Sequence, residues 1–177
     1  GVHKAILELG FESELIDYRN IRDLRELKNF DFVFNALHGF EGEGGKLQQN
    51  LDDLKILYSG SCSEACKNTW NKKFTKEILE INKIRTPISL DITFSKQIVE
   101  NGLQVNSFDR FRPFEYIFLK PEEDGSSVDI FKISDNKSLE EAFQKCTYPN
   151  RKFIFEEFID GREFTVTIID NECLPPI

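Results

Sequence analysis

Residues 31–45 read DFVFNALHGFEGEGG, and this stretch decides the fold class of the first part of the chain. Its first seven residues form a continuous apolar run of strand length, which is typical of a strand buried on both faces of a parallel sheet. A glycine-rich loop follows, and leucines 47, 51 and 54 then recur at helical spacing. The order strand, glycine-rich loop and helix favours a parallel α/β layer, with residues 31–37 as its central strand.

The same alternation extends outward from this stretch. Apolar residues at 2, 5, 6 and 9 predict a helix, and Gly10 stands where a helix-ending glycine is expected. Residues 11–18 are predicted as a strand, residues 21–27 as a short charged helix and residues 56–58 as a further strand. The first part of the chain is therefore predicted to be α/β.

From about residue 60 the predicted strands outnumber the helices. Helical spacing covers residues 72–82 and 138–145. Strand-like runs cover residues 88–94, 115–119, 128–133, 153–158 and 162–169. The second half is therefore predicted to be α+β.

Charge and cysteine usage exclude several classes of protein. The 177 residues hold 23 Lys and Arg against 31 Asp and Glu, a net charge of −8 that argues against a dedicated nucleic-acid binder. No apolar run approaches the roughly 20 residues that span a bilayer, so no membrane association is predicted. The four cysteines lack zinc-site spacing, so we expect free thiols, a cytoplasmic location and no metal site. Residues 61–85 are locally basic, which favours a solvated helix face.

Three segments could carry chemistry. The glycine-rich loop 39–45, between a predicted strand and a helix, could approach an anion, although a tight connection explains it equally simply. Lys120 ends a predicted strand and precedes Gly125-Ser126-Ser127, which resembles a phosphate-holding arrangement and is about as consistent with an exposed lysine beside a hairpin loop. Residues 156–165 could read an adenine edge, but taken alone a polar hairpin is the preferred interpretation.

In chain order these segments resemble the D-alanine–D-alanine ligases, which belong to the ATP-grasp superfamily. The resemblance spans essentially all 177 residues. Its first segment is NALHG at 35–39 with Gly42, Glu43, Gly45 and Gln48. The further segments are the turn YSGS at 58–61, Lys72 with Lys76 and Thr86-Pro87, FLKP at 118–121, GSSV at 125–128, and the hairpin from Glu156 to Val166. It implies a partial Rossmann-like layer followed by the small ATP-grasp lobe.

The resemblance also implies a reaction. ATP phosphorylates one D-alanine carboxylate, and the amine of a second D-alanine attacks the acyl phosphate. The implied roles are phosphate binding by Lys72 and Lys120, adenine binding by Glu156 and Ile159, ribose binding by Glu163, substrate contact by Ser126, and contact with the first D-alanine by His38. Mg²⁺ is an implied cofactor, but the family's metal ligands would follow Ile177, so no metal ligand is expected here. ATP, D-alanine and a second copy in a homodimer are the implied partners.

The implied domains are a partial N-terminal Rossmann-like substrate domain over 1–65, the small ATP-grasp lobe over 66–160, and the start of the C-terminal lobe over 161–177. We expect the chain to be an incomplete portion that is inactive alone. Two alternatives stay open: a degenerate remnant without catalysis, or another ATP-grasp carboxylate–amine ligase such as one accepting D-lactate. The family pattern is broken at four positions, which are Gly44, Asn71, Asp124 and Glu157.

Overall fold

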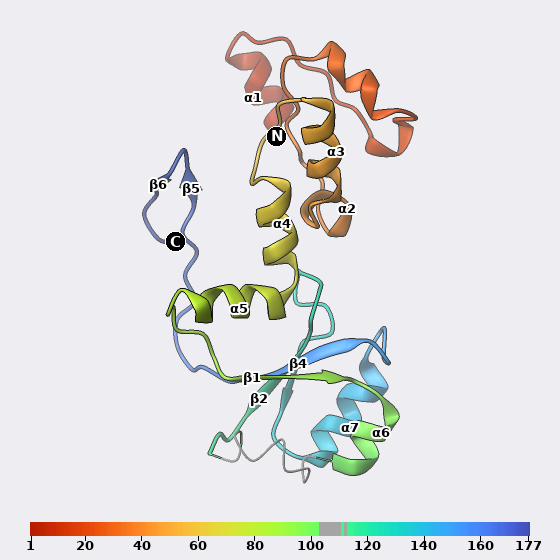
Figure 1. The fold of residues 1–177 in the computed structure, drawn as a ribbon, viewed down its shortest axis with the longest axis vertical. Coiled ribbons are helices and arrows are strands. Elements are labelled where there is room, and N and C mark those ends of the chain that lie inside the picture. Colours follow the sequence, from red (N-terminus) through yellow and green to blue (C-terminus); the bar gives the residue numbers. More distant parts are fainter. Residues whose placement is uncertain (103–110, 112) are drawn as a thin grey trace. The chain divides into compact units, whose positions relative to one another are not determined.

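The computed structural model describes residues 1–102, 111 and 113–177, which form two compact units, Gly1–Asn71 and Lys72–Ile177 (Figure 1). Each unit has its own hydrophobic core. No helix formed by the described residues combines the length and the apolar character needed to cross a membrane. The architecture is mixed α/β, with helices in the first unit and an antiparallel sheet in the second.

The first unit is built from helices around a small leucine-rich core. Leu51 is fully buried, and Leu27, Leu47 and Ile56 pack around it. The leucines of the predicted helix 47–54 therefore face inward, as their spacing indicated. The elements are α1 (Val2–Glu8), the 3-10 helices η1 (Tyr18–Asn20) and η2 (Leu24–Asn29), α2 (Phe40–Glu43), α3 (Lys46–Leu54) and α4 (Ser63–Trp70).

The predicted central strand at residues 31–37 is wrong as a full strand. The segment is extended, but its pairing is a single parallel bridge between Val33 and Tyr58. Asn35 ends the ladder, because its N–H donates to the Ser59 hydroxyl (2.9 Å) and its side-chain oxygen accepts from the Leu37 N–H (3.0 Å). Such local side-chain bonds compete with strand pairing. A parallel sheet is therefore not formed within residues 1–71, all of which the structure describes.

Two other predicted strands are also wrong or shortened. Residues 11–17 are irregular and Tyr18 begins η1, which Asp17 caps by accepting from the Arg19 N–H (3.0 Å). Of residues 162–169, Ile168 and Ile169 alone are in a strand, paired with Glu172–Cys173. Residues 162–167 are exposed and outside any strand, so alternation of apolar residues was not sufficient to form one.

The second unit contains a four-stranded antiparallel sheet in the order β1-β4-β2-β3. The predicted helix 72–82 and the predicted strands near 88–94, 115–119, 128–133 and 153–158 are confirmed with small shifts of their ends. The sequence did not predict α4 or α6. The elements are α5 (Lys72–Ile81), β1 (Ser89–Thr93), α6 (Lys96–Asn101), β2 (Ile117–Pro121), β3 (Phe131–Ile133), α7 (Asn136–Lys145), β4 (Lys152–Glu157), β5 (Ile168–Ile169) and β6 (Glu172–Cys173).

The two faces of this sheet differ in chemistry. Helices α6 and α7 cover one face, where Leu119 and Phe155 are fully buried in the core (Figure 1). Because successive strand residues point to opposite faces, the neighbours Lys120 and Glu156 point to the other face, which α5 covers. Phe118 pairs directly with Glu156 in the β2–β4 register, so side chains of the two central strands lie next to each other on the same face of the sheet. The period-two pattern thus separates an apolar core from a charged face.

A buried carboxylate joins the β2–β3 connection to the turn before β4. The side chain of Asp129 is 3% exposed and accepts hydrogen bonds from the backbone N–H groups of Thr147 (2.9 Å) and Tyr148 (3.3 Å). The guanidinium of Arg151 also donates to it at 2.9 Å. Burial alone would raise the pKa of Asp129, but these donors outweigh burial and hold the pKa below its usual value. Asp129 is therefore a charged anchor of the fold.

We predict that Ile133→Ala destabilises the second unit by about 3 kcal/mol, because a buried isoleucine truncated to alanine leaves a cavity. Ile133 is 1% exposed in the core cluster. The matched control is Ile81→Ala at the end of α5, where the side chain is 80% exposed and the expected change is within about 0.5 kcal/mol. Urea unfolding followed by circular dichroism measures both, and equal midpoints for the two variants would contradict the core assignment.

A second prediction concerns how the contribution of Asp129 to stability depends on pH. The folded-state pKa of Asp129 is depressed, so its contribution to stability is present at neutral pH and is lost as the pH falls through that pKa. We expect Asp129→Asn to be less stable than the wild type at pH 7, with the difference shrinking below about pH 4. Urea midpoints at pH 7, 5 and 3 test this. A difference that stays constant down to pH 3 would show that the ionised carboxylate contributes nothing.

Candidate functional site

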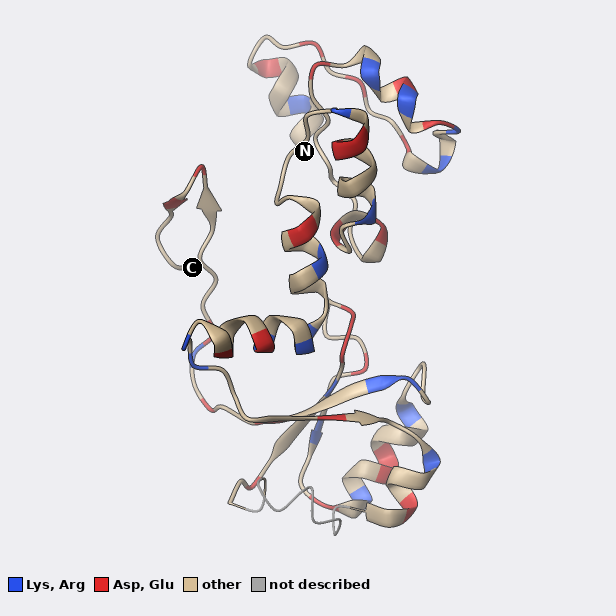
Figure 2. Cartoon of the chain, viewed as in Figure 1, with Lys and Arg blue, Asp and Glu red and all other residues tan. Residues whose placement is uncertain are grey.

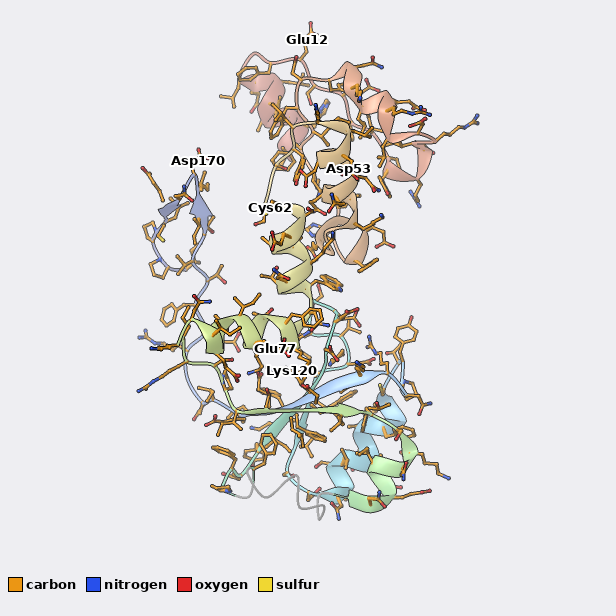
Figure 3. The ribbon with its side chains drawn as sticks, viewed as in Figure 1. Glu12, Asp53, Cys62, Glu77, Lys120 and Asp170 are labelled. Atoms are coloured by element: carbon orange, nitrogen blue, oxygen red, sulfur yellow. The ribbon has the colours of Figure 1, made fainter. Side chains whose placement is uncertain are left out.

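The face of the sheet under α5 holds a buried carboxylate shared by two lysines. Glu156 of β4 bonds the Lys76 ammonium through one oxygen (2.8 Å) and the Lys120 ammonium through the other. The side chains of Glu156 and Lys76 are 10% and 8% exposed. Lys76 also donates to the Thr86 hydroxyl (2.8 Å) and the Pro87 carbonyl (2.6 Å), so all three of its protons are used. Figure 3 shows Lys120 between the sheet and α5.

The electrostatics of this cluster leave an excess of positive charge. Burial by itself would raise the pKa of Glu156, but the ammonium groups of Lys120 and Lys76 lower it more, so the pKa lies below its usual range. Glu156 is therefore ionised at neutral pH. One carboxylate faces two ammonium groups, which makes this face locally basic within an acidic protein. Figure 2 shows the basic residues on α5 and on the strands beneath it.

Lys72, the first residue of α5, adds a further ammonium group to the same region. Its side chain donates to the Asp124 carbonyl (2.8 Å), and its backbone N–H donates to the Glu122 carbonyl (2.8 Å). Burial lowers the pKa of Lys72; the charge of Asp124 opposes this shift and that of Lys120 adds to it. The Lys120 ammonium group is therefore close enough to Lys72 to contribute to the lowering of its pKa.

The loop after β2 places small polar groups beside these lysines. Residues 122–130 connect β2 to β3, and within this loop Ser126 and Ser127 are exposed. Both have left-handed backbone angles, with φ of 51° and 58°. A turn bond from the Val128 N–H to the Gly125 carbonyl (3.2 Å) closes the loop. Exposed hydroxyl and N–H groups next to ammonium groups are suited to holding an anion.

The other residues predicted to bind a nucleotide lie beyond β4. Ile159 and Glu163 are exposed in a stretch without regular structure. Glu157, one of the four positions at which the family pattern is broken, faces away from the shared carboxylate: its side chain accepts from the Ile88 N–H at 3.2 Å. The structure thus brings Lys72, Lys120 and Glu156 together, whereas it leaves Ile159 and Glu163 in solvent.

His38 belongs to the first unit and is the other predicted contact with a substrate. Its side chain is 93% exposed, and Nδ1 lies 3.4 Å from a Glu43 carboxylate oxygen. The second oxygen of Glu43 accepts from the Gly39 N–H at 3.1 Å. The loop therefore presents His38 outward and holds it beside a carboxylate.

Two amide side chains donate hydrogen bonds to the backbone of the segment that follows His38. The Gly42 carbonyl accepts from Asn35 Nδ2 (2.9 Å) and from Gln48 Nε2 (2.6 Å). A Cβ at Gly42 would lie 2.3 Å from the Leu37 carbonyl oxygen, so only glycine fits. Asn35, Gly42 and Gln48 of the first motif are thus structural, and they determine the path of the loop that bears His38.

The sequence missed two charged residues of the second unit. The basic stretch 61–85 was predicted to be a solvated helix face, which is wrong for Lys76, a residue only 6% exposed. Its position four residues after Lys72 places both on one helix face, and this spacing could have indicated a shared site. Arg151 gave no such signal, because its partners Asp124 and Asp129 are remote in sequence.

The part of the chain that the structure describes contains no group of three or more His, Cys, Asp or Glu side chains that could hold a metal ion. Glu156, the buried carboxylate beside Lys76 and Lys120, has both oxygens engaged by their ammonium groups. The donor set therefore does not fit Mg²⁺, and we assign magnesium to no residue. The four cysteines are free thiols.

Comparison with known proteins connects this geometry to a family. The family model described as "D-ala D-ala ligase C-terminus" matches residues 93–175, which include β2, the loop with Ser126 and Ser127, and β4. A D-alanine–D-alanine ligase of Hydrogenovibrio crunogenus is 32% identical over 177 residues, covering 99% of this chain and 54% of that protein.

Solved structures give the same result. The crystal structure of D-alanine–D-alanine ligase from Bacillus anthracis aligns with a TM-score of 0.72 at 30% identity, over 89% of this chain and 50% of that one. The structure of the B. anthracis ligase complexed with ATP aligns with a TM-score of 0.70 at 27% identity, over 86% and 49%. The chain spans about half the length of the relatives it matches. Over most of its 177 residues, the chain is homologous to the D-alanine–D-alanine ligase family of the ATP-grasp superfamily.

Proposed function

We propose that this chain is the part of an ATP-dependent D-alanine–D-alanine ligase that holds ATP. The observation that supports this most is the clustering of Lys72 and Lys120 around the buried Glu156 carboxylate, next to an exposed glycine–serine loop. Two ammonium groups fixed by a helix start and a strand form a rigid binding site for a polyphosphate. The alignment with a relative solved in complex with ATP supports the same assignment.

The proposed roles are those that the resemblance to the ligase family implies. Lys72 and Lys120 bind the phosphates, and Ser126 contacts the substrate from the loop. Glu156 and Ile159 bind the adenine, and Glu163 binds the ribose hydroxyls. Lys120 can exchange Glu156 for a phosphate oxygen at a low cost in free energy, because the ammonium of Lys76 keeps the buried carboxylate paired.

In the proposed reaction the γ-phosphoryl group of ATP passes to the carboxylate of one D-alanine. The amine of a second D-alanine then attacks the acyl phosphate and releases phosphate. The lysine ammonium groups stabilise the negative charge on the transferred group. His38, exposed on its loop, contacts the first D-alanine.

The domain assignment is part of the same proposal. Residues 1–65 correspond to a partial Rossmann-like substrate domain, residues 66–160 to the small ATP-grasp lobe, and residues 161–177 to the start of the large lobe. The four-stranded antiparallel sheet with α6 and α7 on one face and the lysines on the other supports the second of these assignments.

The proposal predicts that Lys120→Ala weakens ATP binding at least about tenfold, since a charged hydrogen bond to phosphate contributes roughly 1.5–3 kcal/mol. The measurement is the dissociation constant of ATP by calorimetry, together with phosphate release in the presence of D-alanine and Mg²⁺. It is made on the protein in the form in which the cell produces it.

The matched control is Lys137→Ala on α7, where the side chain is 84% exposed and remote from Glu156 in the sheet. We expect unchanged ATP affinity for this variant. Wild-type protein that binds no ATP, or a Lys120→Ala variant that binds it as tightly as the control, would contradict the proposed function. Binding without phosphate release would instead identify a nucleotide-binding remnant.

A further inference from the structure

The loop that follows β2 has an unfavourable backbone conformation. Within six residues, four that carry side chains have left-handed φ angles: Asp124 at 108°, Ser126 at 51°, Ser127 at 58° and Asp129 at 53°. Such angles are disfavoured for residues with a Cβ and persist only where surrounding contacts impose them. Something outside the loop must therefore hold it.

Arg151, in the turn before β4, provides these contacts. One guanidinium nitrogen bonds the Asp124 carboxylate, and another donates to Asp129 Oδ2 at 2.9 Å. Its Nε donates to the Tyr148 carbonyl at 3.1 Å. The planar fork of an arginine can make all three bonds at once, whereas a lysine cannot. Arg151 thus connects the first and the last of the strained residues.

The two ends of this bridge are held very differently. The Asp129 side chain is 3% exposed and is also bonded by the N–H groups of Thr147 and Tyr148, so it is fixed. The Asp124 side chain is 36% exposed and lies within the loop itself. Arg151 therefore transmits the position of the fixed end to the exposed end.

We propose that Arg151 is a positioning residue that holds the 124–127 loop in the conformation that receives the phosphates of ATP. This inference rests on the proposed function and adds a residue to it. Because both carboxylates engage Arg151, it acts through the loop and does not itself bind phosphate. Lys72 supports the same conformation by donating to the Asp124 carbonyl at 2.8 Å.

The sharpest test is Asp124→Asn, for which charge and positioning predict opposite results. Removing a carboxylate beside a polyphosphate site should strengthen ATP binding if only long-range charge matters. If the bridge positions the loop, the same change should weaken ATP binding about tenfold, because the neutral Asn amide replaces the ionic bond to Arg151 with a weaker one, while the KM for D-alanine is unchanged. Asp124→Asn leaves the Arg151–Asp129 bond in place, so the fold is kept.

Arg151→Met, and the double variant that combines it with Asp124→Asn, complete a double-mutant cycle. If both residues act through one bridge, the second substitution should add less than about twofold to the first. Arg151→Lys should resemble Arg151→Met, because a single ammonium cannot span the two carboxylates. The control for loss of a carboxylate is Glu140→Gln on the exposed side of α7, for which we expect unchanged ATP affinity.

The outcomes separate the two proposals. Wild-type protein that binds no ATP contradicts the proposed function and this inference together. Wild-type binding with an Asp124→Asn affinity that is equal or tighter overturns the role of Arg151 alone. A fully additive double variant likewise overturns it, because independent effects do not require a bridge.

Discussion

The Glu156 carboxylate buried between α5 and the sheet is the interaction on which the second unit depends. An ionised carboxylate that is 10% exposed is tolerated only when cations and hydrogen-bond donors compensate its desolvation. Lys76 does so from α5 and Lys120 from β2. The same ion cluster therefore fixes α5 over the sheet and brings the two predicted phosphate-binding lysines, Lys72 and Lys120, into one region.

Strand alternation allows this charged cluster to coexist with an apolar core. Leu119 and Phe155 are fully buried on one face, and their sequence neighbours Lys120 and Glu156 face the other. The core determines the register, and the register determines which charges meet. Arg151 extends the same dependence to the loop after β2, because it joins a fixed carboxylate to an exposed one. The register of strands that are distant in the sequence is thus directly connected to the proposed chemistry.

The sequence predicted the second unit better than the first, for physical reasons. The apolar run within residues 153–158 finds partner strands on both sides, β1 and β2, so the prediction matched the structure. Residues 31–37 are equally apolar, but Asn35 diverts the backbone bonds that a strand needs. Lys120 and Glu156 were recognisable only through the resemblance to the ligase family, because an ordinary hairpin explained each segment about as well or better when it was taken alone. The burial of Lys76 and the bridge through Arg151 depend on tertiary contacts that no local pattern encodes.

The central claim is that the cluster around Glu156 is a binding site for ATP and that Lys120 exchanges partners within it. The most direct measurement is the ¹⁵N resonance of the Lys120 ammonium during titration with a non-hydrolysable ATP analogue. The account predicts a saturable shift for Lys120, while Lys76 stays bonded to Glu156 and the exposed Lys137 does not change. A bound analogue that leaves the Lys120 resonance unmoved would contradict the account.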